Sequence, residues 1–166
     1  MTTRPIIRFP DPRLRLPAAP VSTFDAALCL LCDDLIETMR AAPGIGITAP
    51  HIGVAARVTV IELEGEHVRK YVNPKIVWSS PDLITHPEGS VSMPGVSEDV
   101  IRPRAVRVSY QTVEGVAQEE DAEDLLAICL QHEIDQLDGI FWIQKLSRLK
   151  RERAVKRFEK LEKGRG

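Results

Sequence analysis

The residues best suited to chemistry lie in segment 132–136, which reads His-Glu-Ile-Asp-Gln. Positions i and i+4 share one face of a helix, so His132 and Gln136 would point in the same direction. A His-Glu-x-x-His segment on a helix presents two imidazoles to a metal ion and a carboxylate that acts as general base. Here a carboxamide replaces the second imidazole, and a zinc site needs three ligands. Taken alone, the pentad equally suits a hydrogen-bonded histidine in a buried helix.

Three ordered segments carry a wider resemblance. They are 44–51 (Gly-Ile-Gly-Ile-Thr-Ala-Pro-His), 88–92 (Glu-Gly-Ser-Val-Ser) and 131–136 (Gln-His-Glu-Ile-Asp-Gln). These are similar to the three motifs of the peptide deformylases, which are a Gly-rich loop ending in Gln, E-G-C-[LV]-S and Q-H-E-x-D-H. Further matches lie at 10–15, 102–103 and 125–129. By this resemblance, which spans essentially the whole sequence, the chain is identified as a member of that family.

The resemblance implies an activity and roles for particular residues. Peptide deformylases remove the N-formyl group from the initiator Met of new polypeptides, using a divalent metal held by the Cys of the second motif and both His of the third. In this chain His132 matches a metal ligand, and Glu133 matches the Glu that moves the proton of the metal-bound water. His51 occupies the oxyanion-binding position of the family's Gln, and the Val91 backbone amide matches the second oxyanion donor.

Two of the three ligand positions hold other residue types. Ser90 stands where the family has its thiolate, and Gln136 stands where it has its second imidazole. A thiol with a pKa near 8.5 ionises readily beside a metal, whereas an alcohol resembles water, with a pKa of about 15.7. An amide oxygen suits Ca or Mg better than a transition metal. We therefore expect no tightly bound metal and lost or much reduced deformylase activity.

An exchange of residue types leaves a second interpretation open. The family has Gln in its first motif and His at the end of its third, whereas this chain has His51 and Gln136. If both positions face one metal, His51 and His132, with Glu133 or Ser90, would form a changed ligand set for Fe, Zn or Ni. The chain would then be an active metallohydrolase on a formylated peptide or another amide. A metal-free serine hydrolase built on Ser90 and a histidine is a third interpretation.

The resemblance also implies a binding pocket. The residues that match its positions around the Met side chain and the peptide backbone are Ile45, Gly46, Glu88, Gly89, Leu125, Ile128 and Cys129. Apolar residues of this kind are equally typical of an ordinary core. A pocket retained beside an altered metal site would permit binding without turnover. N-terminal Met peptides of nascent chains are therefore the expected ligands.

The C-terminal segment is strongly basic. From Lys145 onward there are ten Lys and Arg residues against three Glu, although the whole chain has a net charge of −2. The cations that a helix would display are Lys145, Arg148, Lys150, Arg151, Arg153, Lys156, Arg157 and Lys160. Such a block is usually the solvated face of a helix. It could also contact RNA by releasing counterions from phosphates, which predicts a possible contact with the ribosome.

Length and composition predict one domain over residues 1–166, with 43% hydrophobic and 28% charged residues. No apolar run approaches the length of a membrane span, and the N-terminus lacks the apolar stretch of a signal peptide. The expected location is cytoplasmic, without membrane or DNA partners. Cys29 and Cys32 are expected to be buried core thiols in a helix rather than a redox pair. His67 and His86 are expected in surface or loop positions.

The expected elements define an α+β fold in which antiparallel sheets surround a central buried helix that carries the pentad. Helices are predicted from Ser22 or Thr23 to Met39, from the acidic residues at 119–124 to Leu137, and over 146–162 as the basic C-terminal helix. Strands are predicted over 57–63, 68–72, 75–78, 106–110 and 113–118. Loops are predicted at 44–53 and 81–100.

Overall fold

The structure, a computed structural model, describes residues 2–165. Its helices are α1 (Ala26–Ala41), α2 (Asp124–Leu137) and α3 (Arg148–Arg165), with short 3₁₀ helices η1 (Pro12–Arg15), η2 (Ala49–Ile52) and η3 (Trp142–Lys145). Its strands are β1 (Gly46–Thr48), β2 (Val58–Ile61), β3 (Arg69–Ser79), β4 (Leu83–Ser90), β5 (Met93–Pro103), β6 (Ala105–Gln111) and β7 (Ala117–Glu123). None of these helices is long and apolar enough to cross a membrane.

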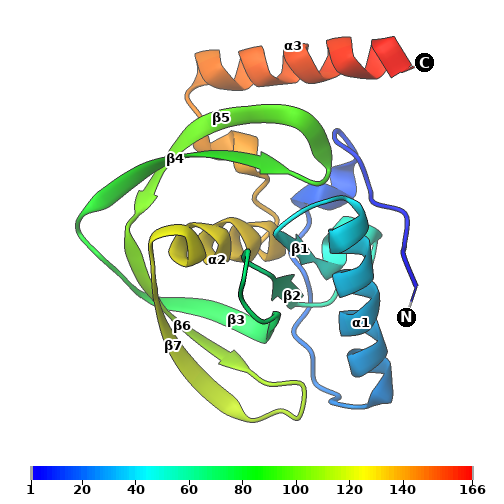
Figure 1. Ribbon diagram of the computed structural model, residues 1–166, viewed down its shortest axis with the longest axis vertical. Coiled ribbons are helices and arrows are strands. Elements are labelled where there is room, and N and C mark those ends of the chain that lie inside the picture. The colour runs from blue at the N-terminus through cyan, green and yellow to red at the C-terminus, as the bar shows by residue number, and fades with distance from the viewer. Residues whose placement is uncertain (1, 166) are drawn as a thin grey trace.

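The strands form two separate antiparallel sheets. Five strands pair in the order β1-β2-β3-β6-β7, and β4 pairs only with β5. Figure 1 shows α2 between these sheets, with α1 at one side and α3 outside β5. The α2 residues Ala127, Leu130 and Ile134 are buried in the core against the five-stranded sheet. The predicted α+β class with a central buried helix is confirmed.

Helix α1 begins later than predicted. Its N-cap is Asp25, whose carboxylate accepts a hydrogen bond from the Leu28 backbone N–H at 3.1 Å, so Ser22 and Thr23 lie outside the helix. A cap needs this bond to a free N–H of the first turn. Within the helix Cys32 is fully buried but Cys29 is exposed. The expectation that both thiols lie in the core is therefore wrong for Cys29.

The prediction of a loop over 81–100 is wrong. This segment forms most of the long hairpin of β4 and β5, which is paired from Leu83↔Pro103 to Ser90↔Met93. Pro87 lies within β4, where the sequence alone indicated a strand breaker. A two-stranded sheet leaves one edge of each strand unpaired, and such edges tolerate proline. The β4–β5 hairpin forms one wall of the cavity described below.

Strands also replace other predicted features. The segments 68–72 and 75–78 are parts of the single strand β3, which bulges where Asn73 takes a positive φ of 52°. The acidic residues before Asp124 lie in β7 rather than opening a helix, and Glu120 accepts a hydrogen bond from the Tyr71 hydroxyl. The strand predicted over 113–118 corresponds to β7, which begins at Ala117, four residues later than predicted. Long-range pairing with β6 outweighs the preference of acidic residues for a helix start.

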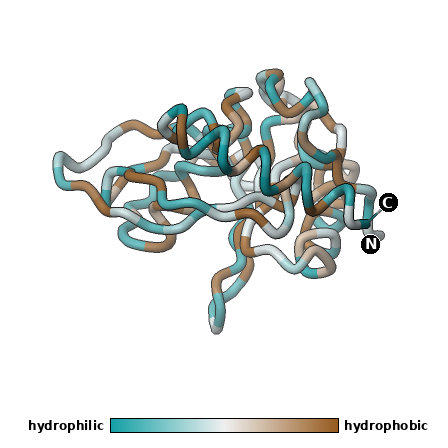
Figure 2. Tube along the Cα trace, turned by 90° about the horizontal axis from the view of Figure 1, so that it is seen from above, coloured by the Kyte–Doolittle hydropathy of each residue, from teal (hydrophilic) through white to brown (hydrophobic). Residues whose placement is uncertain are grey.

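Two further boundaries concern the site and the C-terminus. The predicted loop at 44–53 contains β1 and η2, which fix the Gly-rich segment in place. Helix α3 starts and ends two to three residues later than predicted and packs through Ala154 and Phe158. Figure 2 shows that hydrophilic residues dominate this C-terminal helix.

Candidate ligand-binding and active site

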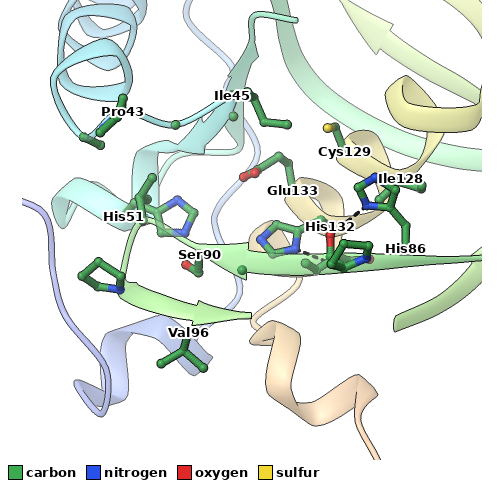
Figure 3. A pocket seen from close by; sticks show the side chains of 18 of the residues that line it. Pro43, Ile45, His51, His86, Ser90, Val96, Ile128, Cys129, His132 and Glu133 are labelled. Atoms are coloured by element: carbon green, nitrogen blue, oxygen red, sulfur yellow. Dashed lines mark hydrogen bonds and ion pairs between the residues drawn. The ribbon is translucent and has the colours of Figure 1, made fainter. Parts of the chain in front are cut away.

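A cavity of about 420 Å³ lies between the Gly-rich segment, the β4–β5 hairpin and α2. Figure 3 shows its side chains converging from these three elements. Of the residues predicted from the sequence, its lining includes Ile45, Gly46, His51, Glu88, Gly89, Ser90, Val91, Leu125, Ile128, Cys129, His132 and Glu133. The remaining lining residues are Ala42, Pro43, Gly44, His86, Pro87, Pro94, Gly95 and Val96.

A chain of charged groups holds His132 in place. Its Nδ1 lies 2.8 Å from Glu88 Oε1, and Glu88 also accepts from Arg102 Nη2 at 2.9 Å. Arg102 in turn donates to Asp135 Oδ2 at 2.8 Å. Burial alone would raise the pKa of Glu88, but the bonds from His132 and Arg102 lower it to about 2. Glu88 is therefore a carboxylate, and His132 Nδ1 donates to it, which leaves Nε2 on the cavity side of the ring (Figure 3).

His51 is held in a single tautomer. The Thr48 backbone N–H donates to His51 Nδ1 at 2.9 Å, and the Thr48 hydroxyl lies 2.9 Å from the same nitrogen. Burial, reinforced by the charge of His132, lowers the pKa of His51 to about 3, so its ring is neutral. Because Nδ1 must accept, Nε2 carries the proton.

Glu133 sits at the back of the cavity, 5% exposed. Burial raises its pKa to about 7, against the opposing charge of His132. Its carboxyl group lies so close to β1 that a Cβ on Gly46 would meet Glu133 Oε1 at 2.8 Å. A side chain at position 46 would therefore force the Glu133 carboxyl group to shift.

Ser90 and Gln136 are placed differently from each other. Ser90 lines the cavity at the turn of the hairpin, where its Oγ accepts from the Ser92 backbone N–H at 3.0 Å. Gln136 is buried but does not line the cavity, because its Nε2 donates to the Leu14 backbone carbonyl at 2.7 Å. The structure thus brings together all the predicted site residues except Gln136.

Within residues 2–165, no group of three or more His, Cys, Asp or Glu side chains is arranged to hold a metal ion. His51 and His132 both line the cavity, but His51 Nε2 carries a proton and offers no lone pair in this tautomer.

Arg102, Asp135 and His86 were not predicted to have a role at the site. Arg102 and Asp135 fix Glu88 and hence His132, and His86 lines the cavity from β4 as a half-buried residue. The alternation of His86, Glu88 and Ser90 along one strand is the signal that could have found His86. His67 is exposed as expected.

The fold and the site define a class of α+β domain in which a central His-Glu helix borders a cavity closed by a Gly-rich segment and a hairpin. The sequence profile of the polypeptide deformylase family matches residues 3–152. A "Peptide deformylase-like" protein of Bradyrhizobium diazoefficiens is 62% identical over 99% of this chain and 97% of its own length. Rhizobium meliloti has a "Peptide deformylase-like" protein at 63% identity, covering 96% of this chain and 94% of the relative.

Rhizobium meliloti also has a "Peptide deformylase" that is 46% identical over 100% of this chain and 98% of that protein. The crystal structure of a peptide deformylase from Legionella pneumophila superposes with a TM-score of 0.93 at 39% identity, covering 99% and 98% of the two chains. That of the Synechococcus elongatus enzyme in complex with actinonin gives 0.90 at 36% identity, covering 95% of this chain and 88% of that one. This chain belongs to the peptide deformylase family.

Proposed function

We propose that this chain binds peptides with an N-terminal methionine in the cavity and has lost, or retains only weakly, the deformylase activity of its family. The observation that carries the proposal is the bond from Gln136 to the Leu14 carbonyl. The side chain at the third ligand position is engaged with the N-terminal segment instead of the cavity. With Ser90 in place of the thiolate, His132 is the one family ligand residue that this chain retains at these three positions.

The residues present do not fit the family's metal. A neutral hydroxyl is a weak donor to a transition metal, and the Gln136 amide is already bonded elsewhere. A metal site in which His51 replaces a missing ligand is also disfavoured. The Thr48 N–H donates to His51 Nδ1, so His51 Nε2 carries the proton and has no lone pair for a metal. We therefore assign no reaction step to a metal.

The pocket itself supports binding. Apolar residues that match the family's Met pocket line the cavity, and among them Ile128 and Cys129 are largely buried. The two relatives that are 62% and 63% identical to this chain are named "Peptide deformylase-like", whereas a Rhizobium meliloti relative that is 46% identical is named "Peptide deformylase". This distribution agrees with a separate branch of the family.

The test compares the natural protein with a variant carrying Ser90→Cys, Gln136→His and His51→Gln. We expect the natural protein to contain far less than one equivalent of Fe, Zn or Ni by plasma emission analysis and to release little formate from a formyl-Met peptide. The triple variant should gain both metal and formate release, since it restores the family's donor types on a scaffold that otherwise matches. Near-stoichiometric metal and efficient turnover in the natural protein would refute the proposal.

We also propose that the exposed cations of α3 contact the ribosome. Ala154 and Phe158 anchor the helix, while seven of the eight predicted basic residues are exposed and Lys150 is half-buried. Of these cations, Arg153 pairs with Glu98 and Arg148 with Glu152, and Lys145, which lies in η3, is close to Asp135. Part of the charge is therefore neutralised within the chain. The rest remains a basic surface that suits phosphates.

A further inference from the structure

One end of the cavity combines a polar ring with apolar side chains. Figure 3 shows the His86 ring reaching from β4 toward α2, where Ile128 and Cys129 lie. Ile128 and Cys129 are 3% and 7% exposed, and the other residues that match the family's Met pocket, Ile45 and Leu125, line the same cavity. A ligand side chain that enters this end therefore meets an imidazole among apolar groups.

The register of the hairpin fixes His86 in this position. His86 is paired with Val100 of β5, and Glu88 follows two residues further along β4. Alternate residues of a strand share one face of the sheet. His86 is half-buried and Glu88 is buried, whereas Thr85 and Pro87 between and beside them are exposed. The pleat of β4 thus holds the His86 ring on the cavity side of the hairpin.

One nitrogen of the His86 ring is bonded and the other is free. Nδ1 lies 2.8 Å from the Pro87 carbonyl oxygen, which can only accept, so Nδ1 carries a proton. In the neutral ring Nε2 then has a lone pair, and within residues 2–165 it has no hydrogen-bond partner. Glu88, the other acceptor on this face, already accepts bonds with both oxygens from Arg102 and His132. His86 Nε2 is therefore the side-chain acceptor left open for a ligand at this end.

A wholly apolar pocket for methionine would reject a polar side chain of the same length, because the polar group would be buried without a partner. We propose that His86 extends the side-chain specificity of the cavity from methionine to glutamine, with His86 Nε2 accepting from the side-chain amide N–H. Glutamine is the uncharged side chain that resembles methionine in length and ends in a donor. The ring is half-buried, so water can reach the remaining polar atoms of that amide.

This inference rests on the proposed function, which places peptides with an N-terminal methionine in the cavity. It adds a second class of N-terminal residue and names the side chain that admits it. Leucine at position 86 would close the same end of the cavity without an acceptor. The choice between methionine and glutamine should therefore depend on this one residue.

The test is calorimetric binding of N-formyl-Met-Ala-Ser and N-formyl-Gln-Ala-Ser, with formate release followed in the same samples. The formyl group prevents the N-terminal glutamine from cyclising. The natural protein should bind the two peptides with affinities within about threefold of each other. His86→Leu should lose about tenfold or more of the affinity for the Gln peptide and little for the Met peptide. His67→Leu is the matched control, because it removes an exposed histidine outside the cavity.

Two results of this experiment would overturn the inference. One is a preference of the natural protein for the Met peptide of about tenfold or more. The other is a ratio of the two affinities that His86→Leu leaves unchanged. Failure to bind either peptide would instead remove the proposed function itself, so the two failures are distinguishable.

A second measurement does not depend on a variant that folds. Nitrogen-15 NMR of labelled histidines in the natural protein, at about pH 8 where an ordinary imidazole is neutral, should show His86 protonated at Nδ1 and bare at Nε2. The Gln peptide should shift the Nε2 resonance toward that of a hydrogen-bonded nitrogen, and the Met peptide should not. A proton on Nε2 of His86 in the free protein, or equal shifts with both peptides, would contradict the proposed contact.

Discussion

At the scale of single residues, the Gln136 side chain makes a structural hydrogen bond and does not line the cavity. Its amide joins α2 to the N-terminal turn through the Leu14 carbonyl, and Leu14 is 1% exposed. The same substitution thus removes an imidazole from the family's ligand set and satisfies a buried carbonyl.

Replacing Gln136 by alanine should lower the free energy of unfolding by about 1–3 kcal/mol, because the Leu14 carbonyl would be left buried without a donor. Urea unfolding followed by circular dichroism measures this. Gln118→Ala, at an exposed position of β7, is the control and should change stability by less than about 0.5 kcal/mol. Equal small effects of both changes would contradict the role of the bond.

His51 should make the stability depend on pH. Burial lowers its pKa from 6.5 to about 3, so between these values the unfolded chain binds a proton that the folded chain does not. This contribution is absent above pH 6.5 and destabilises the fold progressively as the pH falls toward 3.

Near pH 5 the loss amounts to about 2 kcal/mol relative to neutral pH, at roughly 1.4 kcal/mol per unit. His51→Gln removes the titrating group. Its free energy of unfolding should therefore fall by about 2 kcal/mol less than that of the natural protein between about pH 7.5 and pH 5. Identical falls in the two proteins would show that His51 is not the source.

At the scale of elements, the cavity depends on three segments with different local signals. Helix α2 shows the periodicity of a buried helix, and the Gly-rich segment is held by β1 and η2. The hairpin of β4 and β5 has Pro and Gly residues that are typical of a loop, yet its pairing is regular from Leu83↔Pro103 to Glu88↔Glu98, with an irregularity between Glu88 and Ser90. Its strand character comes from pairing rather than from propensity.

The start of α1 can be tested directly. Asp25→Ala should cost about 1 kcal/mol of stability, because the Leu28 N–H loses its side-chain acceptor. Ser22→Ala and Thr23→Ala should have little effect, since the structure places both residues before the cap. The comparison is between the urea midpoints of the three variants and that of the natural protein, provided that the dependence of the free energy of unfolding on urea is unchanged. A larger loss at Ser22 or Thr23 would mean that the helix begins there.

At the scale of the whole molecule, charge is divided unevenly. The segment from Lys145 onward has ten cations and three acids, whereas the chain as a whole has a net charge of −2. Helix α3 keeps this basic segment on the outside of β5, away from the acidic strand β7 (Figure 1).

Co-sedimentation with ribosomes should therefore occur at low ionic strength and weaken steeply with added salt. A variant with Lys156, Arg157 and Lys160 changed to Gln should bind more weakly and show a shallower dependence on salt. Within residues 2–165 these exposed cations form no ion pair, which limits the effect of the substitutions on folding. Absence of binding by the natural protein at low salt would remove the proposal.

The sequence by itself determined the family, the α+β class and twelve of the twenty residues that line the cavity, because ordered motifs and helical periodicity are local properties of the chain. Only the tertiary structure decided that the segment 81–100 is a hairpin and that acidic residues lie in β7, since strand pairing depends on distant partners. Only the tertiary structure decided the tautomers and hydrogen-bond partners of the polar groups. The Thr48 backbone N–H fixes the tautomer of His51, and Arg102 holds the Glu88 carboxylate by a hydrogen bond. The Leu14 carbonyl accepts a hydrogen bond from the Gln136 amide. The bonds of Glu88 and Gln136 join residues 14 and 122 positions apart, so no local spacing in the sequence encodes them, whereas the bond to His51 comes from Thr48, three positions earlier, through the geometry of η2.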